Sequence, residues 1–117
     1  MEISMNNKTV KTISGRVHYL ARMGLPPDSI LEVSLLDVSL ADAPARVLDV
    51  QVTPNARDAG LHFNLTYDLA DVFSNHTYAI SARITHNDQL IFYTTTQHQV
   101  VLGVDHLQGQ EVLVDPV

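Results

Sequence analysis

Six histidines are the residues of this sequence best suited to bind a metal ion or to exchange protons at neutral pH. No two of them form a close H-x-H or H-x-x-x-H pair, although distant residues can still converge in a fold. Metal sites need three or four converging ligands. We therefore expect exposed or singly hydrogen-bonded side chains, no metal ligand and no cofactor, and we keep a metal-binding or small-ligand domain as an alternative. The histidines are His18, His62, His76, His86, His98 and His106.

The 13 acidic residues fall mostly at predicted turns, where Asp bonds to the local backbone. Asp68 and Asp71 have the spacing of residues at the start of a short helix, which we favour over an acid/base pair. Asp37 differs, because the alternation of its strand turns it toward the apolar face. A buried carboxylate must be hydrogen-bonded or have a raised pKa. We expect Asp37 to hold the loop Ser39 to Pro44, with a catalytic role as the alternative.

Other catalytic patterns are missing from the sequence. There is no G-x-S-x-G motif, and the five glycines are too scattered to form a phosphate-binding loop. Without cysteine there is no thiolate nucleophile, no disulfide and no cysteine-bound zinc. The net charge of −6 disfavours nucleic acid as a partner, because phosphate binding needs a basic face. The sequence therefore predicts no catalytic residues and no enzyme.

Short segments of alternating apolar and polar residues, separated by turns about every ten residues, predict the fold. We expect an all-β protein: a two-sheet antiparallel β-sandwich of seven to eight short strands, Ig-like or Greek-key, with one or two short helical turns. A flexible segment at residues 1–9 precedes a single domain over residues 10–117. No apolar run is long enough to span a membrane. The expected strands are Val10–Leu20, one from Ile30 onward, Ala45–Thr53, Leu61–Tyr67, Thr77–Thr85, Gln89–Gln97, His98–Leu102 and Gln110–Val114.

Side-chain phase can be predicted for several of these strands. In Ala45–Thr53 we expect Leu48, Val50 and Val52 to point inward. A three-residue loop, His86 to Asp88, would turn Leu90 and Phe92 inward, whereas a four-residue loop would turn Ile91 and Tyr93 inward. Tyr78 follows a predicted helical turn and opens a strand, which is the placement of the tyrosine corner in Greek-key sandwiches.

The strand that begins at Ile30 does not keep its pattern. Leu31, Val33 and Leu35 share one face, but Leu36 and Val38 fall on the opposite face, with Glu32. A β-bulge near Leu36 would restore the phase. The alternative is an exposed apolar strip, in which Leu36, Val38 and Leu40 would line a groove for a partner segment.

Four phrases of the sequence occur in order: LPPDSILEVSLLDVSLADAP at positions 25–44, YDLADV at 67–72, YAISARI at 78–84 and LIFYT at 90–94. Together they resemble the YscW/YbaY family of bacterial lipoproteins, over roughly Val10 to Val114. That family includes the lipoprotein chaperones, or pilotins, of type III secretion; many other members have no assigned function. The resemblance implies a periplasmic β-sandwich tethered to the outer membrane by lipid, and it supplies no catalytic residues.

The resemblance sets three functional expectations. The first is a non-enzymatic, protein-binding or chaperone-like module, with the pilotin role, helping a secretin or another outer-membrane protein to assemble, as one form of it. The second is a small structural domain of a longer precursor, and the third is an enzyme or a metal or small-ligand binder. The start MEISMNNKTV has no signal-peptide features and no lipidated cysteine. The chain is therefore expected to be the mature part of a lipoprotein or an unlipidated, cytoplasmic family member.

Overall fold

Alternating side chains build nine strands in the part of the chain that the computed structural model describes, residues 9–20, 24–40, 42–103 and 106–117. The flexible segment predicted at residues 1–9 lies, apart from Thr9, outside the described residues. No described helix is long and apolar enough to cross a membrane. The strands are β1 (Val10–His18), β2 (Ile30–Asp37), β3 (Arg46–Thr53), β4 (His62–Asp68), β5 (Tyr78–His86), β6 (Gln89–Tyr93), β7 (His98–Val100), β8 (Leu107–Leu113) and β9 (Asp115–Pro116).

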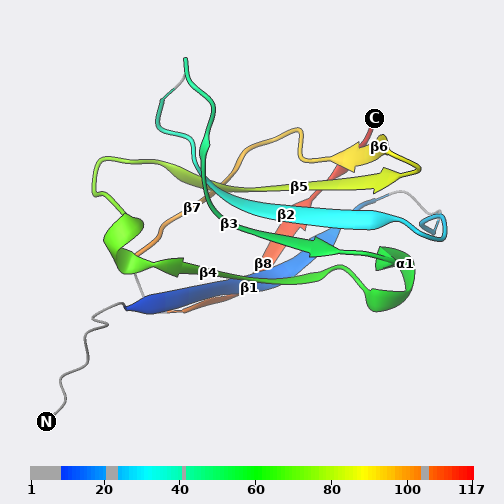
Figure 1. Ribbon diagram of the computed structural model, residues 1–117, viewed down its shortest axis with the longest axis horizontal. Helices are drawn as coiled ribbons and strands as arrows, with labels where there is room; N and C mark the ends of the chain where they lie inside the picture. The colour runs from blue at the N-terminus through cyan, green and yellow to red at the C-terminus, as the bar shows by residue number, and fades with distance from the viewer. Residues whose placement is uncertain (1–8, 21–23, 41, 104–105) are drawn as a thin grey trace, which may run out of the picture.

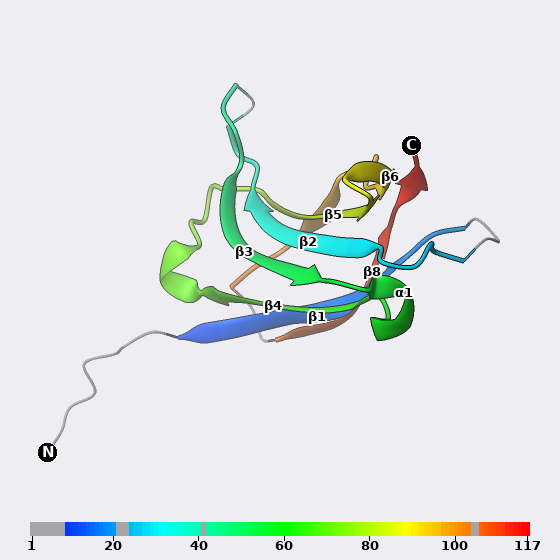
Figure 2. The same ribbon diagram turned by 45° about the vertical axis from the view of Figure 1, so that its right-hand side comes forward.

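Two sheets face each other, as Figures 1 and 2 show. One has the strand order β4-β1-β8, and the other has the order β3-β2-β5-β6-β9, with β7 also paired to β5. This confirms the predicted all-β sandwich. The prediction of purely antiparallel sheets is wrong in one place, because β1 and β8 pair in parallel. Strands so far apart in sequence need no tight turn between them, and a parallel pair is then sterically possible.

The core lies between the sheets and is made by alternate residues of each strand. Leu31, Val33 and Leu35 of β2 are fully buried, and Phe63, Leu65 and Tyr67 repeat the pattern in β4 as predicted. The expected helical turn is present as a 3₁₀ helix, η1 (Leu69–Asp71), in which the Asp68 carboxylate accepts a hydrogen bond from the backbone N–H of Ala70. A second single turn, α1 (Ala56–Ala59), is also present, in agreement with the one or two short helical turns that the sequence predicts.

The predicted bulge near Leu36 exists, but it lies in β3 and not in β2. Leu35 pairs with Asp49 and Leu36 pairs with Val47, so Leu48 is the extra residue. Because β2 keeps its own alternation, its phase is not restored, and Asp37 continues the inward series begun by Leu31. The connection between β2 and β3, which we call the arm (residues 38–45, with position 41 outside the description), projects from the sandwich in Figures 1 and 2.

The prediction that Val50 and Val52 point into the core is wrong: these side chains are 45% and 56% exposed. Their neighbours Asp49 and Gln51 take the inward phase, and they do so for a physical reason. β3 and β4 are the adjacent edges of the two sheets, and the free backbone groups of β4 need partners. Asp49 accepts from the N–H of Thr66, and Gln51 both accepts from the N–H of Asn64 and donates to the carbonyl of His62.

The β5–β6 hairpin places Phe92 in the core, as predicted. The loop itself is shorter than expected, since only Asn87 and Asp88, both with positive φ, lie between the paired residues His86 and Gln89. A register shift beyond Thr85 then pairs Ile84 with Phe92. This shift gives Phe92 the inward phase that a three-residue loop would have given it. The prediction that Leu90 points inward as well is wrong, because Leu90 pairs with Thr85, and Ile91 packs against the core instead.

Gly15 allows β1 and β8 to approach closely at the point where their register shifts. A Cβ atom on Gly15 would lie 1.9 Å from the backbone oxygen of Gln110, so any side chain must push the strands apart. We expect Gly15→Ala to lower the free energy of unfolding by about 3 kcal/mol or more, measured by urea denaturation.

Gly24→Ala is the matched control, because nothing lies within 4 Å of the Cβ that it would add. It should change the stability by less than about 1 kcal/mol. Equal stability of the two variants would contradict the close approach of β1 and β8.

Candidate functional site

Asp37 is a buried carboxylate at the base of the arm, with 7% of its surface exposed. Its Oδ1 accepts hydrogen bonds from the backbone N–H of Ser39 at 3.0 Å and from the Ser39 hydroxyl at 2.6 Å. Its Oδ2 accepts from Nδ1 of His76 at 2.5 Å, and the guanidinium of Arg46 lies 3.5 Å from the same oxygen. Both carboxylate oxygens are therefore occupied by donors.

These donors decide the charge state of Asp37. Burial alone raises the pKa of a carboxyl group, but the hydrogen bonds from the Ser39 hydroxyl, from His76 and from the Ser39 backbone, together with the charge of His76, outweigh it. The pKa of Asp37 is consequently held well below its ordinary value. The group is an ionised acceptor and is poorly suited to act as a general acid or base near neutral pH.

The same cluster joins the arm to the segment that follows η1. The Ser39 hydroxyl accepts from the backbone N–H of Thr77, whose carbonyl accepts from the N–H of Val38. Arg46 donates to the backbone oxygen of Asp71 at 2.9 Å. Asp37 thus holds its loop, as the sequence predicts, and it also connects this loop to residues 71–77.

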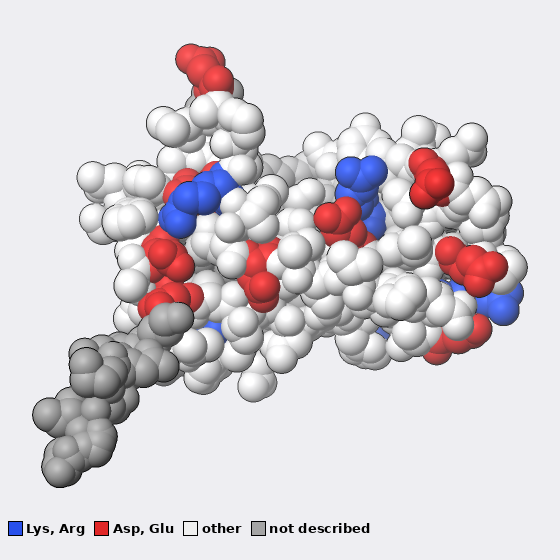
Figure 3. Space-filling view, in the orientation of Figure 1, with Lys and Arg blue, Asp and Glu red and all other residues white. Residues whose placement is uncertain are grey.

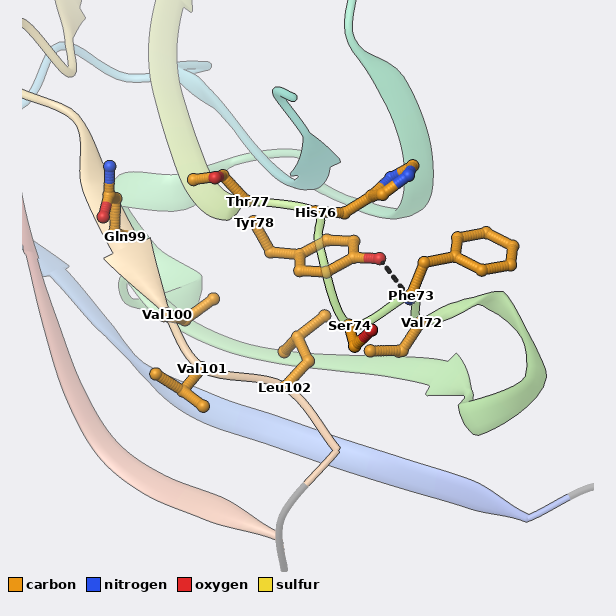
Figure 4. A pocket seen from close by; sticks show the side chains of 10 residues that line it. All are labelled: Val72, Phe73, Ser74, His76, Thr77, Tyr78, Gln99, Val100, Val101 and Leu102. Carbon is orange, nitrogen blue, oxygen red and sulfur yellow. Dashed lines mark hydrogen bonds between the residues drawn. The ribbon is translucent and has the colours of Figure 1, made fainter. Parts of the chain in front are cut away.

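Next to this cluster lies a cavity of about 260 Å³, which we call the end pocket (Figure 4). It opens between the segment after η1 and the segment that begins with β7. In Figure 4, Val72 and Leu102 lie close together below the Tyr78 ring, while the ring of Phe73 points outward. The lining residues are Val72, Phe73, Ser74, His76, Thr77, Tyr78, Gln99, Val100, Val101 and Leu102.

Tyr78 shapes the wall of this pocket. Its hydroxyl accepts a hydrogen bond from the backbone N–H of Phe73 at 2.8 Å, which confirms the tyrosine-corner placement predicted from sequence. The Phe73 ring lies 5.0 Å from the His76 ring and 5.7 Å from the guanidinium carbon of Arg46, yet 49% of Phe73 stays exposed. An exposed aromatic side chain held in place by Arg and His is typical of an interaction surface.

A second, smaller cavity of about 130 Å³ lies beside the arm, and we call it the arm pocket. It shares His76 with the end pocket, so the two adjoin. Together they form a surface with apolar patches at Leu40 and Pro44 on one side and at Val101 and Leu102 on the other. The arm pocket is lined by Asp37, Ser39, Leu40, Pro44, Arg46 and His76.

The three residues predicted to line a partner groove occupy different positions. Leu36 and Val38 are half-buried, and Leu40 is 71% exposed and lines the arm pocket. Their role in binding stays a prediction. Sequence reasoning missed Phe73 and Val101, which is 73% exposed. Phe73 follows Val72 and directly precedes the polar turn residues Ser74 and Asn75, and this position was the only local signal available for it.

The histidines do not gather into one centre. His76 contacts Asp37, His98 contacts Gln110 at 3.1 Å, and His106 accepts from the backbone of Thr12. His18 lies 3.2 Å from Glu111. Among the described residues, no group of three or more His, Asp or Glu side chains is arranged to hold a metal ion.

The two pockets have walls of mixed apolar and polar side chains, and the buried carboxylate beside them has both oxygens occupied by donors. Comparison with known proteins identifies the family of the chain. Residues 8–110 match the model of the type III secretion system lipoprotein chaperone family, YscW. The chain belongs to the YscW family. The resemblance found in the sequence phrases is thereby confirmed.

The chain is also similar to two individual proteins. It is 41% identical, over 90 residues, to the uncharacterised lipoprotein YbaY of Escherichia coli (strain K12), covering 76% of this chain. The match spans about half, 47%, of that protein's length. An alternative pilotin from the type II secretion system of Vibrio cholerae has a solved structure that superposes with a TM-score of 0.81 at 35% identity, covering 93% of this chain and 98% of that one.

The Asp37 cluster predicts a specific pH dependence of stability. Replacing Asp37 by Asn removes the charge that Ser39 and His76 stabilise, and should lower the free energy of unfolding at pH 7 by about 2 kcal/mol. Because the folded-state pKa is depressed, this contribution is present above the unfolded pKa, about 4, and is lost as the pH falls further. The gap between the wild type and Asp37→Asn should therefore narrow from about pH 4 downward in chemical denaturation curves.

Asp42→Asn provides the control, since Asp42 is exposed on the same arm. This variant should follow the wild type at every pH. A stability gap for Asp37→Asn that stays constant down to pH 2 would show that the carboxylate charge is not what stabilises the cluster.

Proposed function

We propose that this chain is a non-enzymatic chaperone domain of the YscW family that acts in the bacterial envelope by holding a short segment of a partner protein. The observation that carries the proposal is the likeness to the Vibrio cholerae pilotin, which extends over nearly the whole of both chains. The family description, lipoprotein chaperone, supports the same role. We further propose that the partner is an outer-membrane secretin and that the domain lies on the periplasmic side of that membrane.

The end pocket and the arm pocket are the proposed binding surface. A short peptide segment needs apolar depressions for a few side chains and nearby polar groups for its backbone. The end pocket offers Val72, Val100 and Leu102 in its walls, with Ser74 and Gln99 at hand for hydrogen bonds. Leu40, predicted from sequence as a lining residue, would extend this surface along the arm.

Crosslinking in the living cell tests this assignment. A photoreactive amino acid is placed at Val101, on the rim of the end pocket, in the full-length protein of the bacterium that encodes it. The matched control carries it at Leu20, which is 79% exposed and lies two residues beyond the C-terminal end of β1, away from the pocket. We expect irradiation to link the Val101 variant, and not the Leu20 variant, to a secretin subunit, identified by mass spectrometry.

A second measurement addresses the chaperone role directly. Deletion of the gene should reduce the heat-resistant secretin multimers in outer-membrane fractions, and the wild-type gene should restore them. Unchanged multimers together with no Val101-specific crosslink would reject the proposed function.

A further inference from the structure

The surface around the end pocket carries unneutralised negative charge. Asp71 is exposed and directly precedes Val72 and Phe73 of the end pocket, and Asp42 is exposed on the arm, between Leu40 and Pro44 of the arm pocket in sequence. Neither carboxylate has an ion-pair partner among the described residues. Figure 3 shows acidic atoms at the tip of the arm and again at the end of the molecule below it, with basic atoms between them.

Among the residues that the structure describes, the basic side chains nearby already have other partners. Arg46 is already committed to the Asp37 carboxylate and to the backbone oxygen of Asp71. Lys11, which pairs with Tyr67 near the start of β1, takes part in an interaction of its own. The chain as a whole has a net charge of −6, so the wider field has the same sign.

We propose that the segment held at the end pocket is apolar with one or more lysine or arginine side chains beside its apolar residues, and that Asp71 and Asp42 receive this positive charge. The inference rests on the proposed function, in that a peptide segment binds at this surface. Apolar side chains would enter beside Val72 and Leu102, while the cationic group stays at the exposed rim. There it gains attraction to the two carboxylates without a large desolvation cost.

The charge pattern argues against other occupants. A second copy of the chain would bring a further −6, and an anionic lipid or a nucleic acid would meet the same carboxylates. An apolar segment with acidic flanks would be repelled at the rim. An apolar peptide that carries positive charge fits both the apolar side chains of the end pocket and the exposed carboxylates beside it.

An unbiased peptide selection tests the inference. A phage-displayed library of random 15-residue peptides is selected on the purified wild-type chain, with counter-selection on Val101→Asp to remove peptides that bind elsewhere. The same selection is run on the double variant Asp42→Asn/Asp71→Asn. Its matched control is Asp88→Asn, because Asp88 is exposed at the tip of the β5–β6 hairpin and its positive φ suits Asn.

We expect lysine and arginine to be enriched in peptides selected on the wild type and on Asp88→Asn, but not on the double variant. The best peptide, labelled with fluorescein and measured by anisotropy, should bind the double variant about fivefold more weakly than the wild type in low salt. This difference should vanish in 0.5 M NaCl, where exposed charges are screened.

The possible outcomes distinguish a failure of the proposed binding surface from a failure of the proposed positive charge on the peptide. Peptides that depend on Val101 but show no basic enrichment would overturn this inference and leave the proposed binding surface intact. Equal weakening by Asp88→Asn would also overturn it, since the effect would then follow from net charge and not from position. If no selected peptide depends on Val101, the proposed binding surface itself fails.

Discussion

β2 is bonded on both sides within the larger sheet, and it keeps one unbroken inward alternation from Leu31 to Asp37. The rest of the structure depends on this constraint. A strand fixed by two neighbours cannot change phase alone, so the extra residue goes to β3 and a carboxylate is turned inward at the end of β2. That carboxylate then requires donors, and they come from the arm, from β3 and from the segment after η1. The end pocket has its shape because these parts are held together.

The sequence predicts those features that depend on local alternation and turn chemistry. Phe63, Leu65 and Tyr67 are buried as their period-two pattern indicates, and the Asn-Asp turn of the β5–β6 hairpin lies where the sequence predicts a short loop. Asp37 could be singled out for the same reason, since its phase conflicts with its charge. Each of these inferences needs only residues that are near neighbours in sequence.

Features that depend on distant residues could not be predicted in this way. Val50 and Val52 look like core residues until β4 is known to lie beside β3 with free backbone groups that Asp49 and Gln51 can satisfy. The parallel pairing of β1 with β8 and the end pocket likewise join segments more than twenty positions apart in the sequence. For a chain of the YscW family, the general fold follows from pattern, whereas the site is formed by loops that the fold brings together.

The bonds that Asp49 and Gln51 make to the backbone of β4 have a consequence for association between molecules. Sheet borders with vacant amide and carbonyl groups are where proteins recruit foreign strands and grow into fibrils. Along this border the N–H groups of Asn64 and Thr66 and the carbonyl of His62 are already bonded to side chains of the same molecule. An incoming strand would have to break these side-chain hydrogen bonds before it could pair with β4. The bonds therefore disfavour polymerisation along this edge, even at high protein concentration.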